Sequence, residues 1–239
     1  EVEFTATLYV KDPFYNAANP VNNQAELMDT TAPRDTRTTG PVDAGNAPKS
    51  IKAVAGDKLE VPITFTDPRY TIDAVITNAL TGAKVPDNIW SYAKGKIKIN
   101  MPIEDISIEV TFREKTEEDK RKVTLIYDDL DSDPAADPHG VATISTTLSD
   151  GTFQSTSTHR DPDKLYPLYK LENTVDITLK PDSDYTYAVT VLSDGMLLTP
   201  TLPVTDNGDG TYTTSFDIQD KDAEVHVVFH QKIPGEDWV

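Results

Sequence analysis

The chain has 239 residues with 40 Asp and Glu against 22 Lys and Arg, and its formal net charge of −18 disfavours binding to nucleic acids and anionic lipids. It contains no cysteine, which excludes disulfides, thiolate metal sites and cysteine nucleophiles. No run of about 18 apolar residues is present, so we expect no insertion into a membrane.

Alternating apolar and polar residues predict strands from the first residues onward. In EVEFTATLYV every second residue from Val2 to Val10 is apolar, which is the two-residue period of a β-strand. Because the sequence opens on a strand and has no signal-peptide pattern, we expect it to be part of a longer polypeptide. The same alternation predicts further strands over 96–100, 106–112, 122–127 and 175–180.

Two pairs of segments match in order and spacing, which indicates an internal repeat. VPITFTDPRYTIDAVIT (61–77) matches VDITLKPDSDYTYAVTV (175–191), and each contains a turn followed by a tyrosine. MPIEDISIEVTF (101–112) matches FDIQDKDAEVHVVF (216–229), the last predicted strand of each copy. The repeat predicts that each half of the chain folds as one β-sheet unit.

We therefore expect an all-β protein of two tandem antiparallel β-sandwich domains with long loop insertions. The domains should cover residues 1–114 and 121–239. The charged segment KTEEDKRK begins at Lys115 and is typical of a linker, which we place at about 115–120.

The turn–tyrosine motif, the GDGTYT segment and the closing strand ending in VTF resemble repeats in large surface proteins of Gram-positive and gut bacteria. The resemblance covers about 50–112 and 171–230. It implies immunoglobulin-like or related β-sandwich modules that connect a ligand-binding or catalytic head to a cell-wall anchor. It also implies an extracellular location, at the cell surface or secreted, beside further modules of the same parent chain. The long insertions at 12–50 and 128–170 depart from the pattern.

The acidic segment TDNGDGTYTTSF is predicted to be a hairpin turn rather than a calcium loop. A calcium loop beginning at Asp206 would need oxygen ligands at its third and fifth positions, which are Gly208 and Gly210. Asn-Gly and Asp-Gly pairs instead favour the positive φ angles of tight turns between strands.

A second acidic segment, DDLDSDPAADPHG, contains a candidate calcium site. Three aspartates have the one-three-five spacing of a calcium loop, but Pro134 replaces the usual glycine and Gly140 replaces the closing glutamate. A solvated acidic loop is the favoured interpretation, no cofactor is expected, and a calcium site of another kind is the alternative. Its candidate ligands are Asp128, Asp129, Asp131, Asp133 and Asp137.

No catalytic motif is present, so we do not expect an enzyme. The nucleophile elbow and the His-Glu-x-x-His motif are both missing from the sequence. His226 and His230 lie on a predicted strand about 13 Å apart, too far to share one zinc ion. An isopeptide crosslink between Lys98 or Lys122 and Asn100 or Asn173 has no supporting motif.

The long insertions are the remaining place for a binding site. Aromatic and arginine side chains on loops are enriched in binding surfaces. The alternative is that the rings fold back and fill the edges of the sandwiches. The candidate ligand-binding residues are Phe14, Tyr15, Arg34, Arg37, Phe153, Tyr166 and Tyr169.

We therefore expect a non-catalytic extracellular fragment of a bacterial surface protein that adheres to a host protein or a glycan. The alternative is a pair of spacer or accessory modules of a large secreted enzyme that degrades glycans or proteins.

Overall fold

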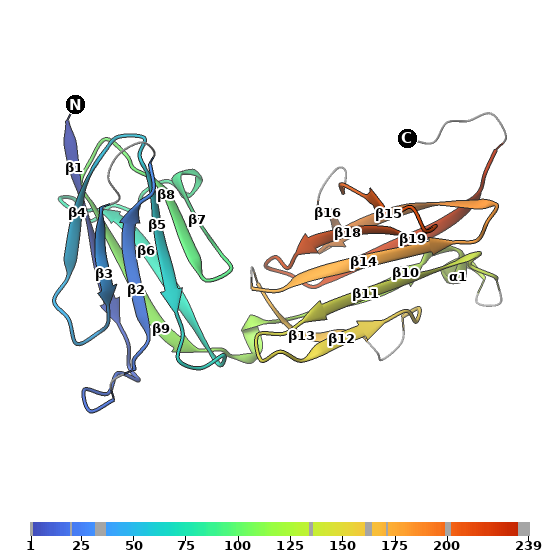
Figure 1. Ribbon diagram of the computed structural model, residues 1–239, viewed down its shortest axis with the longest axis horizontal. Helices are drawn as coiled ribbons and strands as arrows, with labels where there is room; N and C mark the ends of the chain where they lie inside the picture. The colour runs from blue at the N-terminus through green and yellow to red at the C-terminus, as the bar shows by residue number, and fades with distance from the viewer. Residues whose placement is uncertain are drawn as a thin grey trace. The chain divides into compact units, whose positions relative to one another are not determined.

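The computed structural model in Figure 1 confirms an all-β protein. Its contacts divide the chain into two compact units, Glu1–Thr116 and Glu117–Val239. For residues 131 and 132 the description covers the backbone alone. The structure describes residues 2–19, 21–31, 37–133, 136–160, 164–170, 172–198 and 202–233.

The first unit is a β-sandwich of two sheets. One sheet has the order β4 (Lys49–Val54), β1 (Glu3–Lys11), β9 (Ile106–Glu114) and β6 (Tyr70–Asn78). The other has the order β3 (Thr38–Val42), β2 (Gln24–Asp29), β5 (Lys58–Thr64), β8 (Lys96–Asn100) and β7 (Trp90–Ala93). A short 3-10 helix, η1, covers Asp87–Ile89.

The second unit is also a sandwich of two sheets. One has the order β13 (Leu165–Tyr169), β10 (Lys120–Tyr127), β19 (Ala223–Gln231), β15 (Tyr185–Ser193) and β16 (Met196–Leu197). The other has the order β12 (Phe153–Thr156), β11 (Gly140–Thr147), β14 (Thr174–Pro181), β18 (Tyr212–Asp217) and β17 (Thr205–Asp206). Two short helices complete the unit, η2 (Glu117–Asp119) and α1 (Asp128–Ser132).

The two units share one topology, strand for strand, apart from the added β16. The segments that match in the sequence fall on equivalent strands, β5 with β14, β6 with β15 and β9 with β19. One strand pair in each unit differs from the expected antiparallel arrangement: the first strand runs parallel to the last. Ala6 pairs with Ile106 in one unit, and Val123 pairs with Ala223 in the other.

Each unit has its own hydrophobic core, formed by the inward residues of both its sheets. Phe112 is fully buried in the first unit and meets Phe65 edge-on at 5.8 Å between ring centroids. Leu125 and Val225 lie in the core of the second unit. Because side chains alternate between the two faces of a strand, every second residue of the central strands is buried.

The turn before the repeated tyrosine is held by the same contacts in both units. Lys115 donates its backbone N–H and its Nζ to the carbonyls of the two residues before Tyr70, at 2.8 Å each. Lys232 donates to the two residues before Tyr185 at 2.8 and 3.0 Å. The lysine that follows the last strand therefore fixes the turn that leads into the neighbouring strand.

The segment TDNGDGTYTTSF forms the predicted hairpin. Thr205 and Asp206 of β17 pair with Thr213 and Tyr212 of β18, and the turn between them has φ angles of +76° at Gly208 and +83° at Gly210. Positive φ angles favour glycine, so the glycines serve the backbone of the turn.

In each unit a buried polar side chain stabilises a turn between two strands, β4 and β5 in the first unit and β13 and β14 in the second. Asp57 is 5% exposed, and its Oδ2 accepts the N–H of Val54 at 2.7 Å. At the equivalent position Asn173 is 3% exposed, and its Oδ1 accepts the N–H of Tyr169 at 2.8 Å. The residue type differs between the units, but both supply one buried acceptor.

We expect Asn173→Ala to destabilise the second unit by about 1–3 kcal/mol, because the N–H of Tyr169 would lose its acceptor in a buried place. Denaturant unfolding followed by circular dichroism measures the change. The matched control is Asn88→Ala at an exposed position of η1. A loss of stability no larger than that of the control would contradict this role of Asn173.

Candidate functional site

In the first unit the candidate aromatic residues pack against their own unit. Phe14 stacks on Tyr70 with 4.6 Å between the ring centroids and 22° between the planes. A Cβ atom added at Gly45 would overlap the hydroxyl of Tyr15, so that ring lies against the backbone of Gly45. Phe14 remains 40% exposed, but its contact with Tyr70 gives it a structural role.

Arg37 is also engaged within the first unit, and Arg34 lies outside the described residues. The Nη1 of Arg37 is 2.7 Å from Glu3 Oε1 and donates to the carbonyl of Lys52 at 2.6 Å. The hydrogen bond with Glu3 raises the pKa of the Arg37 guanidinium above its ordinary value. Because Lys52 lies on the edge strand β4, Arg37 covers a backbone acceptor that would otherwise be open to another strand.

The second unit covers its equivalent edge with an uncharged side chain. The amide of Gln154 donates to the carbonyl of Tyr166 at 2.9 Å and accepts the N–H of Tyr166 at 2.9 Å. These two bonds join β12 of one sheet to β13 of the other. They also fix the backbone that carries the Tyr166 side chain.

Two rings of the second unit are exposed on these joined edge strands. Phe153 is 67% exposed and Tyr166 is 42% exposed. The Tyr166 hydroxyl donates to Glu117 Oε2 at 3.4 Å, and Lys164 Nζ lies 6.0 Å from the centre of the ring. Tyr169 is half-buried, and burial raises the pKa of its hydroxyl.

The outward face of the sheet β12-β11-β14-β18-β17 carries rows of hydroxyl side chains that sequence reasoning missed. Residues that pair directly across strands point to the same face of a sheet. We name this surface the hydroxyl face. One row across the strands is Thr143, Thr178, Thr213 and Thr205, and the next is Ser155, Ser145, Asp176 and Ser215.

Phe153 belongs to the same surface. It pairs directly with the exposed Thr147 of β11, so its ring stands at the border of the hydroxyl face. Val141, 51% exposed, lies on this face beside Lys180. The surface therefore combines an exposed ring, an exposed aliphatic side chain and rows of hydroxyls.

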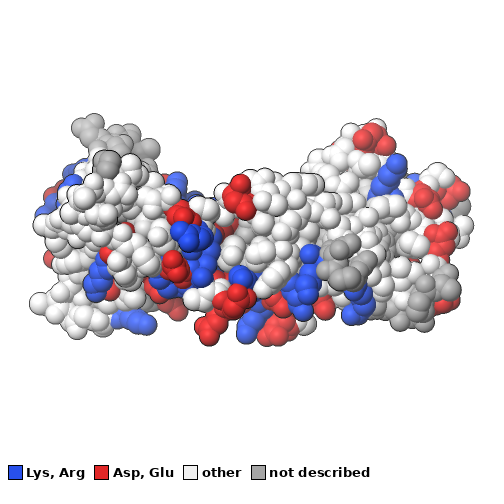
Figure 2. All heavy atoms as spheres, turned by 90° about the horizontal axis from the view of Figure 1, so that it is seen from below, with Lys and Arg blue, Asp and Glu red and all other residues white. Residues whose placement is uncertain are grey.

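The equivalent face of the first unit is built from charged side chains instead. Lys96 Nζ lies 2.7 Å from Glu60 Oε2, and Lys58 Nζ donates to Asn100 Oδ1 at 2.6 Å. Figure 2, which draws one side of the whole chain, also shows Lys and Arg lying among Asp and Glu. Opposite charges side by side are typical of a solvated protein surface.

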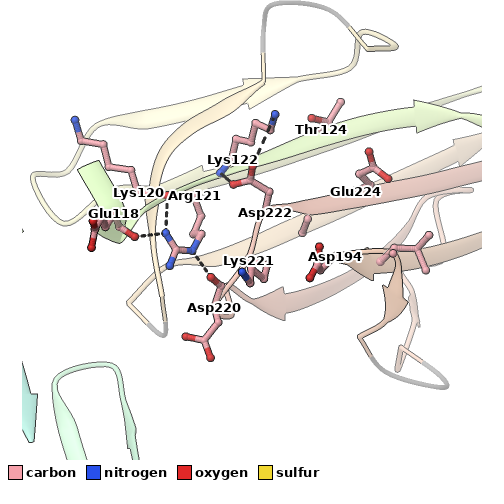
Figure 3. A pocket seen from close by; sticks show the side chains of 13 residues that line it. Glu118, Lys120, Arg121, Lys122, Thr124, Asp194, Asp220, Lys221, Asp222 and Glu224 are labelled. Atoms are coloured by element: carbon pink, nitrogen blue, oxygen red, sulfur yellow. Dashed lines mark hydrogen bonds and ion pairs between the residues drawn. The ribbon is translucent and has the colours of Figure 1, made fainter. Parts of the chain in front are cut away.

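A polar groove of about 670 Å³ lies in the second unit, at the starts of β10 and β19. Figure 3 shows Arg121 directed between Glu118 and Asp220, and Arg121 donates to the carbonyls of both, at 2.6 Å for Asp220. Lys122 pairs with Asp222, whose Oδ1 accepts the N–H of Lys122 at 3.0 Å. These cations hold neighbouring chain segments together.

The five candidate calcium ligands lie at the end of β10 and after it. Asp128 Oδ1 is 2.7 Å from His226 Nδ1, and Asp137 Oδ1 accepts the N–H of His139 at 3.0 Å. Asp129 lies in α1 and Asp133 directly follows it, whereas the side chain of Asp131 is outside the described part of the chain. Among the described residues, no three His, Asp or Glu side chains are grouped so that they could hold a metal ion.

Three of the four residues considered for an isopeptide crosslink have other partners, and the fourth, Lys98, is exposed. Lys122 pairs with Asp222, Asn100 accepts from Lys58, and Asn173 binds the backbone of β13. The buried polar residues of the described ranges include no lysine. The chemistry requires a buried, neutral lysine amine, and these side chains do not provide it.

No protein-family model matches the sequence, and no curated protein matches it either. Among solved structures, the chain is similar to the pilus adhesin SpaC of Lactobacillus rhamnosus GG, with 10% identity and a TM-score of 0.27 over 96% of this chain. The chain spans 31% of the length of that adhesin. It is also similar to two B repeat units of the collagen-binding protein of Staphylococcus aureus, with 15% identity, a TM-score of 0.23, and 98% and 70% of the two chains covered. In the described part of the chain, no helix has the length and hydropathy of a membrane span.

We expect removal of calcium with a chelator to leave the melting temperature unchanged within about one degree, because Asp128 and Asp137 are engaged by His226 and by the backbone. Thermal unfolding in calcium and in chelator measures the difference. A clear drop in chelator, restored by calcium but not by magnesium, would establish the calcium alternative.

Proposed function

We propose that the chain is a non-catalytic extracellular fragment of a bacterial surface protein and that its second unit binds a host protein or a glycan. One observation carries the proposal: Phe153 and Tyr166 are exposed on the edge strands β12 and β13, which Gln154 joins by two hydrogen bonds of 2.9 Å. An exposed ring on a fixed backbone is a suitable anchor for a partner.

Exposed aromatic rings can contribute much of the binding affinity because of the apolar area that they offer to a partner. A buried aromatic side chain removes about 150–250 Å² from water, and aromatic anchors dominate the affinity of many interfaces. Because Gln154 already holds the backbone of Tyr166, binding does not have to order this strand. The candidate ring Phe14 of the first unit differs, since it already packs on Tyr70.

The alternative proposal is a pair of spacer or accessory modules of a large secreted enzyme. The parallel pairing of first and last strands favours it. Two neighbouring parallel strands begin at the same end, so the start of β1 and the end of β9 lie at opposite ends of the first unit. The same holds for β10 and β19 in the second. Such units suit an end-to-end array.

We expect Phe153→Ala and Tyr166→Ala each to weaken binding to the partner by about tenfold or more, the loss that is typical of an anchor residue. A host-protein and glycan array identifies the partner, and titration of the purified chain measures the affinity. The melting temperature should hold, because both rings are exposed.

The matched control is Tyr9→Ala on β1 of the first unit, where the tyrosine is 38% exposed. This variant should keep full affinity. If the chain gives no signal on the array, the spacer alternative replaces the binding proposal. Equal losses in all three variants would contradict the proposal, because the loss of affinity would then not be specific to the second unit.

A further inference from the structure

The hydroxyl face has a regular spacing that follows from its strand pairing. Thr143, Thr178, Thr213 and Thr205 stand on four neighbouring strands, and each pairs directly with the next. Adjacent strands are about 4.8 Å apart, and the second row lies two residues along each strand, about 6.7 Å away. The face therefore presents a lattice of hydroxyl groups.

Most of these hydroxyls are available to a ligand. Thr143, Ser145, Thr178 and Ser215 make no side-chain hydrogen bond to another residue of the described ranges. A hydroxyl can donate one hydrogen bond and accept two, and it rotates to suit its partner. Each free position can therefore pair with either a donor or an acceptor.

The two hydroxyl rows carry fewer charged residues than the rest of the molecule. The chain carries a net charge of −18, and charged residues make up 26% of it. In the two hydroxyl rows Asp176 is the one charged residue among the eight described positions, while Lys180, paired with Val141, and Asp217, paired with Thr174, lie on the same face outside these rows. The equivalent face of the first unit has Lys96 paired with Glu60. The centre of this face therefore presents hydrogen-bonding groups with a single charge, where the first unit has an ion pair.

We propose that the hydroxyl face binds a neutral polysaccharide, with the chain of sugars lying across the strands along the rows and one sugar ring stacked on Phe153. The inference rests on the proposed binding function of the second unit, and it names the class of partner. Sugar hydroxyls would pair with the threonine and serine hydroxyls, and Asp176 would accept a hydrogen bond from one of them.

The chemistry of the surface selects this partner over others. An anionic polysaccharide would be repelled by the net charge of −18, and the two rows contain no cation, since Lys180 lies outside them beside Val141. A protein partner normally requires an apolar centre in the interface, and the centre of this face is polar. Phe153, 67% exposed, supplies an aromatic platform at the border, where the apolar C–H face of a sugar ring can lie.

The test uses the full chain on affinity gels that contain xylan, mannan or mixed-linkage β-glucan, with polygalacturonate as the anionic counterpart. We expect retardation in at least one neutral gel and none in polygalacturonate. The double variant Thr143→Val, Thr178→Val keeps the shape of both side chains and removes both hydroxyls. Two lost hydrogen bonds should weaken binding by about tenfold.

The matched control is Thr190→Val, a half-buried outward position on β15 of the other sheet in the same unit. It should bind like the unchanged chain. Circular dichroism and melting temperature verify that all variants fold. Thr178→Lys, which places a charge in the centre of the row, should abolish retardation in neutral gels.

The outcomes separate this inference from the proposed function. If no neutral polysaccharide binds but a protein partner does, with Phe153→Ala and Tyr166→Ala weakened, the polysaccharide inference is wrong and the binding function holds. If polysaccharide binds equally well to the double valine variant and to the control, the hydroxyl face is not the site. If nothing binds, the proposed function itself fails.

Discussion

Each unit depends on the pairing of its first strand with its last. The N–H of Thr5 at the start of β1 bonds to Asp105 Oδ1 at 2.5 Å, across 100 residues. The second unit has the equivalent hydrogen bond. The N–H of Lys122 donates to Asp222 Oδ1 at 3.0 Å, also across 100 residues. The entropy cost of closing a loop grows only slowly with its length, so one long closure is tolerable when it completes a core. The remaining strands pack around this central parallel pair.

The two units keep the contacts that serve the backbone and differ in the side chains that face outward. Asp57 and Asn173 are different residues, yet each supplies a buried acceptor to the same turn. Arg37 and Gln154 differ in charge, yet each donates to a backbone carbonyl of the equivalent edge strand of its unit, β4 in the first and β13 in the second. A buried polar group without a partner is costly, so these hydrogen bonds are constrained even where the residue type is not.

The sequence alone predicted the strands, the repeated turn before Tyr70 and Tyr185, and the glycine hairpin, because these depend on local pattern. Alternation indicates which residues share a face of a strand, but it does not indicate which strands are neighbours. The parallel pairs and the hydroxyl face were therefore missed, although alternate Thr and Ser in 143–147 were visible. Residue type likewise could not separate Phe14, which stacks on Tyr70, from the exposed Phe153.

Sheet stability alone does not account for the hydroxyl face. Threonine has a high strand propensity, and cross-strand threonine pairs stabilise sheets, so the row through Thr178 has a structural benefit. The first unit, however, forms the same sheet with the Lys96–Glu60 ion pair on that face, so the fold does not require the hydroxyls. Stability also gains little from Phe153, because a ring that is 67% exposed has buried little of its area. Free hydroxyls and an exposed ring on one face are what a ligand would use, and the fold itself leaves both without a partner.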